Sequence, residues 1–460
     1  PSRGLGDVYK RQNIGRENME IEENFFDKLK NEKRCVKIRN SIDYCTEISN
    51  NADDMEAVER LRRLIEPWLS GILQSEYLSM LIGTGLTQSV CCVANVNSSS
   101  MGTVDFKDYQ DKINRYAEKS AKKMGRGKYN IEDQIRTSLE LLEGYEIDDN
   151  MLDAKKLSPI IDEVLETFGN SILLAENEFA NKLETGDSNA EWAMKCLISF
   201  MLTFSSRNAT RDRLHIFTTN YDRFIEYACD NAGIKILDRF FGKIEPTFSE
   251  NEPNIDYYYR VSDSQNEFRF AENVVRYSKL HGSVDWVQKK NKICRSCLKF
   301  GADKIMDIDK NKYKEQLMIY PNSMKSVETA FHPYAELFRD FSSSICRPNS
   351  ALVVYGYGFG DSHINKIINE MLNIPSTHIV IIAYSIDERL IGFLKTVNLD
   401  QVTLLCGAEI ASIDKLVSYY LPKSAIDKIS LVVAKILKER EMFKEDKEKS
   451  LEESDQEEDE

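Results

Sequence analysis

Short, continuous apolar runs recur along the chain and are separated by helix-length segments. Continuous rather than alternating hydrophobicity is typical of strands that are buried on both faces of a sheet. Seven runs have this character: residues 78–82, 214–218, 277–280, 317–320, 352–355, 378–384 and 402–405. Strand, crossover and strand in succession predict an α/β fold with a doubly wound parallel sheet.

Outside these runs the spacing of apolar residues is helical. Between residues 20 and 74, charged positions occupy one face of the expected helices, and Leu61, Ile65 and Trp68 lie on another. Residues 105–211 are mostly polar and carry two apolar stripes at helical spacing. We interpret this second stretch as a helical insertion within the α/β domain.

The patterns together predict a chain of several parts. We expect an N-terminal helical segment (13–75), an α/β domain (76–411) with a helical insertion (about 105–211), a C-terminal helical segment (412–438) and an acidic tail (439–460). The tail is mostly charged and has no apolar period, which predicts disorder.

Residues 1–12 are expected to be foreign to the protein. Reverse-translated, residues 4–12 correspond to one reading frame of a common sequencing-library transposon end, so we interpret them as read-through and exclude them. Their removal takes two positive charges from the net charge of −14, which becomes −16. Seven acidic residues lie in 451–460, so the body carries a charge of about −9.

Composition and charge exclude several classes of protein. No stretch approaches the roughly 18 apolar residues of a membrane span, so we expect no membrane association. An acidic body disfavours general binding to phosphate backbones, and we interpret the basic residues between 115 and 128 as an exposed helix end. The ten cysteines are scattered, which is typical of a reducing interior and predicts a cytoplasmic protein.

Four of the predicted strands end in glycine-rich or polar sequence, where ligands of an open α/β sheet bind. The first, 78–82, continues as Gly83-Thr84-Gly85-Leu-Thr87. Glycines there would let the backbone approach a pyrophosphate while the N–H groups of the following helix face its charge. The alternative is a tight turn with a purely structural role.

Polar residues follow two further strands. Thr219-Asn220-Tyr-Asp222 follows 214–218 and indicates a polar site, with helix capping as the alternative. His281, followed by glycine, comes at the end of 277–280. Such a histidine can reach into a cleft and suits proton transfer, or it can be a hydrogen-bonded structural residue.

The fourth strand end, after 352–355, is a glycine-rich turn into a helix. It reads Gly356-Tyr-Gly358-Phe-Gly360-Asp361 and places polar residues at the start of the helix. The alternative is a flexible turn in which Asp361 caps the helix.

In this order along the chain, the four segments resemble the sirtuin family. GTGLT is similar to the sirtuin phosphate loop GAGxS, TTNYD to the segment TQNxD, KLHGSVDW to the strand with the catalytic histidine, and GYGFGDSHIN to the loop that closes on the ribose. TTNYD, GYGFGD and the helix start at 130–133 are closer to bacterial sirtuin-like proteins of antiphage defence than to protein deacylases. The resemblance covers about residues 76–411.

The resemblance implies a Rossmann-like NAD-binding domain and a role for each matching residue. Asn220 and Asp222 would hold the nicotinamide and order the attacking water, and His281 would accept a proton. The positions that it implies for contact with NAD+ are Gly83, Thr84, Gly85, Thr87, Thr219, Gly356, Gly358 and Asp361.

Departures from the sirtuin pattern refine the expected activity. Only one CxxC pair, Cys294 and Cys297, follows the histidine strand, and two thiolates do not complete a tetrahedral zinc site. Thr219 replaces the glutamine of TQNxD, and Gly358 stands where serine is frequent. We therefore expect no zinc, and an NAD+ glycohydrolase that produces nicotinamide and ADP-ribose. A protein deacylase and a non-catalytic module that senses NAD+ or ADP-ribose are the alternatives.

The resemblance also implies that the activity is gated, because a constitutively active NADase would poison its own cell. It implies the effector of a prokaryotic antiphage system, with a homo-oligomer, a phage protein or a HerA-like ATPase as the trigger. We expect no direct binding to nucleic acid.

Overall fold

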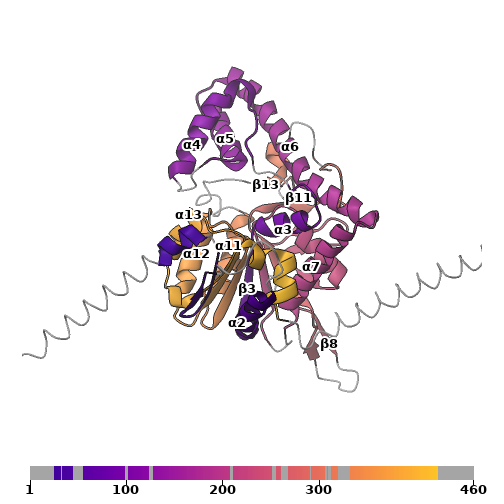
Figure 1. Cartoon of the computed structure of the whole chain (residues 1–460). Coiled ribbons are helices and arrows are strands. Elements are labelled where there is room, and N and C mark those ends of the chain that lie inside the picture. Colours follow the sequence, from indigo (N-terminus) through magenta and orange to yellow (C-terminus); the bar gives the residue numbers. More distant parts are fainter. Residues whose placement is uncertain are drawn as a thin grey trace, which may run out of the picture.

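The structure is a computed structural model of the chain (Figure 1). It describes residues 25–32, 34–44, 55–98, 102–123, 128–207, 211–250, 255–260, 268–290, 292–305, 308, 312–319 and 332–422. The expected read-through (1–12), the acidic tail (439–460) and most of the expected C-terminal helical segment lie outside these residues.

A nine-stranded sheet forms the centre of the described chain, in the order β2-β1-β16-β15-β14-β3-β4-β10-β5. Its strands are β1 (Cys35–Ile38), β2 (Ser41–Asp43), β3 (Tyr77–Ile82), β4 (Leu214–Thr218), β5 (Lys235–Leu237), β10 (Val274–Lys279), β14 (Ser350–Tyr355), β15 (His378–Ala383) and β16 (Val402–Cys406). The seven strands from β16 to β5 pair in parallel. The prediction of a doubly wound parallel sheet is confirmed, and six of the seven predicted strands lie in it.

The seventh predicted strand was placed in the wrong sheet. β13 (Leu317–Ile319) pairs antiparallel with β11 (Gly282–Lys289). Both belong to a five-stranded sheet that also contains β12 (Lys292–Arg295), β7 (Thr247–Phe248) and β6 (Phe240–Phe241). A run of three apolar residues carries no period, so the sequence could not distinguish a parallel from an antiparallel partner.

The segment predicted to be helical at the N-terminus also contains strands. Residues 25–32 and α2 (Met55–Leu73) are helical, but β1 and β2 lie between them and extend the sheet. β1 pairs antiparallel with β16, and β2 pairs antiparallel with β1. β1 was not predicted from the sequence, because the charged Lys37 interrupts its apolar run. The Lys37 ammonium is buried and donates to the carbonyl oxygens of Leu399 at 2.6 Å and Val402 at 3.1 Å.

Between β3 and β4 the described chain is helical, as its periodicity predicts. The helices are α3 (Gly85–Val93), η1 (Lys107–Tyr109), α4 (Gln110–Lys123), α5 (Ile131–Ile147), α6 (Met151–Glu184) and α7 (Ser188–Ser205). α5 begins with a capping box in which Asn130 and Asp133 exchange side-chain and backbone hydrogen bonds. In Figure 1, α4 and α5 lie above the sheet, with α3 between them and the strands. No helix among the described residues is both long enough and apolar enough to cross a membrane.

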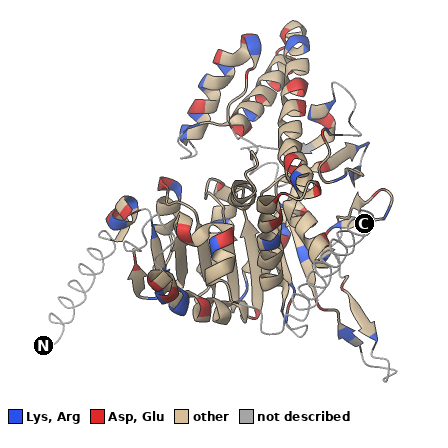
Figure 2. Ribbon diagram, turned by 45° about the vertical axis from the view of Figure 1, so that its right-hand side comes forward, with Lys and Arg blue, Asp and Glu red and all other residues tan. Residues whose placement is uncertain are grey.

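Helices cover both faces of the sheet. The remaining helices are α8 (Phe224–Ala232), α9 (Tyr313–Gln316), α11 (Tyr334–Ile345), α12 (Ser362–Leu372), α13 (Glu388–Leu394), α14 (Ala408–Ala411), α15 (Ile413–Lys415), η2 (Leu399–Gln401) and η3 (Leu416–Tyr420). α7, α8 and η3 pack in the apolar cluster on one face, and α11, α12 and α13 pack on the other. A hairpin of β8 (Tyr258–Arg260) and β9 (Phe268–Phe270) projects at the end opposite to α4 and α5 (Figures 1 and 2).

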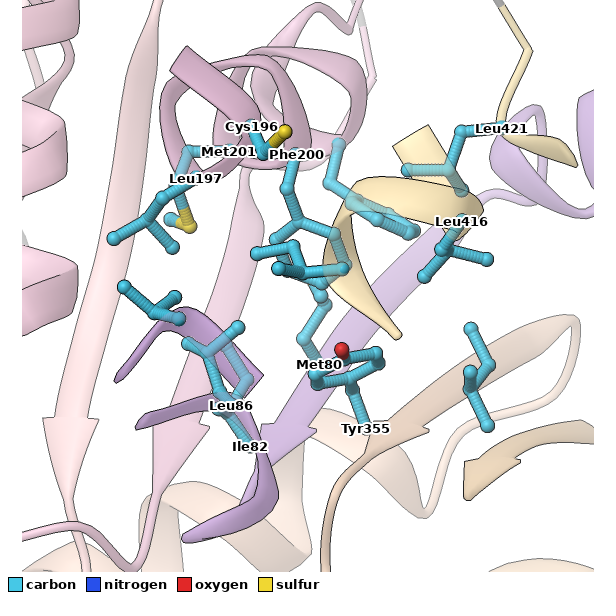
Figure 3. Packing of buried hydrophobic residues seen from close by; sticks show 14 of the residues in the cluster. Met80, Ile82, Leu86, Cys196, Leu197, Phe200, Met201, Tyr355, Leu416 and Leu421 are labelled. Atoms are coloured by element: carbon cyan, nitrogen blue, oxygen red, sulfur yellow. The ribbon is translucent and has the colours of Figure 1, made fainter. Parts of the chain in front are cut away.

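The core on the α7 face is built around Phe200, which packs with Met80 and Tyr355 (Figure 3). The Phe200 side chain is fully buried, and its ring centroid lies 5.1 Å from that of Tyr355. Buried apolar packing of this kind fixes the strands on which the loops at the sheet edge are mounted.

We expect Phe200→Ala to lower the free energy of unfolding by about 3–5 kcal/mol, because it removes a buried ring and leaves a cavity. Urea denaturation followed by circular dichroism measures the loss. Leu174→Ala, at a side chain that is 53% exposed, is the matched control and should change stability by less than about 0.5 kcal/mol. Equal effects of the two substitutions would contradict this description of the core.

Candidate functional site

The carboxyl ends of four parallel strands meet at one edge of the sheet. Ile82 of β3 is paired with Thr218 of β4 and with Tyr355 of β14, and Thr218 is also paired with Lys279 of β10. The strand order reverses between β3 and β14, because β4 and β10 lie on one side of β3 and β14 and β15 on the other. Such a reversal is where open α/β sheets form a ligand-binding crevice.

Three glycines of two loops pack directly against one another at this edge. The N–H of Gly83 donates to the carbonyl oxygen of Tyr355 and that of Gly85 to Gly356, both at 2.9 Å. A Cβ on Gly83 would lie 2.5 Å from the Gly356 oxygen, and one on Gly85 would lie 2.6 Å from the Gly356 Cα. Gly356 also has a φ of +63°. These glycines are therefore needed for contact between the loops, and contact of their backbones with a ligand stays a prediction.

A buried polar cluster joins α3 to the loop after β4. The Thr87 hydroxyl donates to Asp222 Oδ2 at 2.7 Å and accepts from Asn220 Nδ2 at 3.1 Å. The Asn220 backbone N–H donates to the Thr218 hydroxyl at 3.1 Å. The Asn220 side chain is 1% exposed, and its Oδ1 has no hydrogen-bond partner among the described residues. An unpaired buried amide oxygen is unfavourable, so this position is suited to a donor that a ligand supplies.

Asp222 has a structural role beside any role in binding. Its Oδ1 accepts the backbone N–H of Phe224, the first residue of α8, at 3.3 Å. The N-cap residue of this helix is Arg223, so Asp222 is not its cap as the capping alternative proposed. Burial raises the pKa of Asp222 above its ordinary value, and the charge of Lys279 opposes this rise. The Lys279 ammonium is itself buried and binds Glu226 Oε1 at 2.9 Å.

A buried ion pair that the sequence did not indicate holds the loop after β4 in place. Glu176 of α6 is fully buried and accepts from the Arg223 backbone N–H at 2.8 Å and from its guanidinium at 2.5 Å. Burial raises the pKa of Glu176 to about 7, although the Arg223 charge acts in the opposite direction. The two residues are distant in sequence, and neither belongs to a motif, so only the fold reveals the contact.

We expect Glu176→Ala to lower the free energy of unfolding by about 3–5 kcal/mol, because it leaves the buried Arg223 without its carboxylate. Denaturant unfolding of the purified variant measures this change. Glu163→Ala is the control on the same helix: this side chain is 63% exposed and pairs with Lys107, so its loss should be below about 1 kcal/mol. A free energy of unfolding equal to that of the wild type in Glu176→Ala would contradict the stabilising role of the Glu176–Arg223 pair.

His281 lies on the loop between β10 and β11 and is bonded to Asp361. The distance from His281 Nε2 to Asp361 Oδ2 is 3.0 Å, and both side chains are buried. Asp361 also caps α12, because its Oδ1 accepts the backbone N–H of His363 at 3.1 Å. A carboxylate acceptor favours the tautomer with hydrogen on Nε2, in which Nδ1 is the nitrogen that accepts a proton.

Tyr221 lies between the cluster of Thr87, Asn220 and Asp222 and the pair of His281 and Asp361. Its ring centroid is 6.3 Å from that of His281, and its hydroxyl donates to Glu132 of α5 at 3.1 Å. Burial raises the pKa of Tyr221 well above its ordinary value, so the phenol stays protonated and can donate. Tyr221 thereby connects the helices above the sheet to the loop that carries Asn220 and Asp222.

Three further predicted residues line the same edge without joining either hydrogen-bonded group. Thr84 is exposed and is the N-cap residue of α3. Thr219 is 9% exposed, and its N–H donates to the Ile82 oxygen at 3.1 Å. Gly358 is exposed, and a Cβ there would meet open space. The contacts therefore unite Thr87, Asn220 and Asp222 as one group and His281 and Asp361 as another.

Two adjoining cavities open at the start of α3. The smaller, of about 30 Å³, is lined by Thr84, Thr87, Gln88, Ser98, Ile172, Tyr221 and Asp222. The larger, of about 460 Å³, lies over the ends of β14 and β15 and includes Gly85, Gln88, Gly356 and Tyr384 in its lining. Gln88 lines both cavities, and Thr87 and Asp222 of the polar cluster line the smaller one, at the switch point of the sheet.

The region around the CxxC pair offers few ligands to a structural zinc ion. Cys294 is buried on β12, and the exposed Cys297 donates to the Ile244 oxygen at 3.5 Å. The described part of the chain contains no group of three or more His, Cys, Asp or Glu side chains placed to hold a metal. These residues do not fit the tetrahedral set that such a site requires. That the protein needs no zinc stays a prediction.

Residues 214–402 match the family model of the SIR2-like domain. Over these residues the chain is similar to SIR2-like domains, which use NAD+. The match includes Asn220, Asp222, His281 and Asp361, whereas β3 and its glycine turn precede it. No curated protein shows a significant match to the chain.

Proposed function

We propose that this protein is an NAD+ glycohydrolase, which cleaves NAD+ to nicotinamide and ADP-ribose. The buried Oδ1 of Asn220, which has no hydrogen-bond partner among the described residues, carries the proposal. Asn220 lies in the segment that matches the SIR2-like domain, and it bonds Thr87, which with Asp222 lines a small cavity at the switch point of the sheet. The amide N–H of a nicotinamide is the kind of donor that would satisfy this oxygen. The larger adjoining cavity would hold the remainder of the dinucleotide.

The chain's own side chains supply what cleavage of an N-glycosidic bond requires. The bond between the ribose C1′ and the nicotinamide nitrogen breaks, the electron pair leaves with the neutral nicotinamide, and water attacks C1′ through an oxocarbenium-like transition state. Asn220 and Asp222 orient the leaving group and the water. His281 accepts the proton of the water, and Asp361 is a positioning residue that holds the histidine ring.

The nucleophile distinguishes hydrolysis from transfer to another acceptor. We expect turnover of NAD+ in heavy-oxygen water to place one labelled oxygen on the ribose of ADP-ribose, detected by mass spectrometry. Formation of an acyl-ADP-ribose from an acetylated peptide, with no ADP-ribose formed in its absence, would instead identify a deacylase. NAD+ binding without any product would identify a sensing module.

The biological setting that we infer is a cytoplasmic, gated effector of a prokaryotic antiphage system. The helix start at 130–133 supports this setting, since it is one of the segments that resemble the antiphage proteins. In the structure this start contacts the site through Glu132 and Tyr221. A homo-oligomer, a HerA-like ATPase or a phage protein would supply the trigger. Measurement of NAD+ turnover by the chain alone and with the product of its neighbouring gene tests the gating.

A further inference from the structure

A second polar cavity lies at the amino-terminal edge of the sheet, opposite to the NAD+ site. It has a volume of about 190 Å³ and is lined by the first residues of β3, by His215 of β4 and by Arg276 and Ser278 of β10. α11 covers it with Asp340 and Ser344. Because His215 is paired with Arg276 across β4 and β10, the strand register itself fixes this part of the wall.

Four guanidinium groups from separate segments meet at this cavity. Arg213 precedes β4, Arg239 follows β5, Arg276 lies within β10, and Arg347 follows α11. Three aspartates also line the cavity, and each lies within ion-pair distance of an arginine: Asp340 of Arg239, Asp212 of Arg347, and Asp238 of Arg295, which is not among the lining residues. Arginine in such clusters is the residue that recognises phosphoryl and carboxylate groups through paired hydrogen bonds.

Two of the arginines are fixed in the wall by bidentate ion pairs. Arg239 binds the two carboxylate oxygens of Asp340 at 2.6 and 2.7 Å, and Arg213 binds those of Asp256 at 2.9 and 3.3 Å. Arg347 has no such bidentate pair: its Nε donates to the Ser343 carbonyl oxygen at 2.6 Å, and its Nη1 lies 3.5 Å from Asp212 at the mouth. The guanidinium of Arg347 also lies 5.1 Å from the centroid of the Tyr77 ring.

His215 is a buried, hydrogen-bonded group in the wall of the cavity. Its Nδ1 is 2.8 Å from the Ser344 hydroxyl, and its Nε2 is 3.2 Å from the Ser278 hydroxyl. Burial lowers the pKa of His215 well below its ordinary value, and the charges of Arg276, Arg347 and Arg239 lower it further. The ring is therefore neutral at physiological pH, and the interior combines arginine charge with neutral hydrogen-bonding groups.

The cavity continues outward into a larger depression of about 620 Å³. The two share Tyr77, Asp212, Arg213 and Arg347, and the outer part adds Glu76, Arg211, Asp256 and Phe270. Phe270 belongs to the β8–β9 hairpin, which projects at this end of the molecule (Figure 2). The inner volume is suited to one phosphoryl group, and the outer depression offers room and an aromatic side chain for the molecule that carries it.

We propose that this cavity is a second ligand site, which binds a phosphoryl group, free or carried by a nucleotide, and which is separate from the NAD+ site. Arg276 and Arg347 provide the charge at the bound anion, while Arg213 and Arg239 hold the walls. The proposal does not depend on the catalytic activity, because it concerns the opposite edge of the sheet.

Isothermal titration calorimetry of the full chain with pyrophosphate, inorganic phosphate and ADP tests this site. We expect binding of pyrophosphate in the micromolar to millimolar range, weakened by a factor of about 10 or more in Arg276→Gln and in Arg347→Gln. Arg63→Gln on α2, where the side chain is 79% exposed, is the matched control and should bind as the wild type does. Tighter binding of ADP than of pyrophosphate would identify a nucleotide as the carrier, and tighter binding of the inorganic anions would identify a free phosphate species.

Arg347→Gln keeps the test valid if Arg276→Gln fails to fold, because the Arg347 side chain is 41% exposed and thermal unfolding can verify its stability. No binding of any of the three anions to the wild-type chain would overturn the proposal. Binding that is undiminished in a folded Arg347→Gln variant would overturn it as well, since the anion would then occupy another site.

Discussion

His281→Ala is expected to reduce NAD+ hydrolysis by a factor of about 10²–10⁴, the usual effect of removing a positioned general base. The reason is local: His281 is buried at the edge of the sheet where β3, β4, β10 and β14 end, and Asp361 fixes its ring at 3.0 Å. The measurement is the initial rate of nicotinamide release, compared between wild type and variant at saturating NAD+.

Two further variants separate catalysis from folding. Asp361→Asn keeps the size of the side chain but removes its charge, so it should change the pH profile of the rate and lower kcat less than His281→Ala does. His363→Ala is the matched control, because its backbone N–H rather than its side chain bonds Asp361. Full turnover by a folded His281→Ala variant would remove His281 from the mechanism.

Asn220→Ala should lower kcat by a factor of about 10²–10³, because the amide that orients the leaving group is lost. Stability should remain close to that of the wild type or increase, since the substitution also removes a buried oxygen that has no partner among the described residues. Loss of activity without loss of stability is thus the expected signature of a residue that is retained for its ligand.

The comparison for Asn220→Ala is Thr87→Val, which removes the hydroxyl that bonds both Asn220 and Asp222. That variant should lose both stability and activity, because it leaves Asp222 Oδ2 without its donor in a buried place. Thermal unfolding and steady-state kinetics measure the two effects. A large loss of stability in Asn220→Ala with unchanged kcat would contradict the assignment.

Much of the parallel sheet was predictable, because strands buried on both faces produce continuous apolar runs. The predicted bounds of β4 agree with the structure, and β3 begins one residue earlier than predicted. The carboxyl ends of parallel strands meet at one edge of the sheet, so the sequence alone assigns the polar segments after them to that edge.

Contacts that depend on long-range packing were not predictable. The charge of Lys37 obscured β1, and the antiparallel partner of β13 left no period in three residues. Residues 176 and 223 carry no motif, and their ion pair exists only because α6 passes behind the loop after β4. The mutual contact of Gly83, Gly85 and Gly356 also gives a structural reason for glycines that the sequence suggested as ligand contacts.

The central claim, that the edge carrying Asn220 and His281 cleaves NAD+, is tested most directly by NAD+ consumption. The purified chain would be incubated with NAD+, alone and with the product of its neighbouring gene, and nicotinamide and ADP-ribose would be quantified by chromatography beside His281→Ala. We predict equal amounts of the two products in at least one of these conditions and their loss in the variant. NAD+ that is bound but never consumed, or equal turnover in wild type and variant, would contradict the claim.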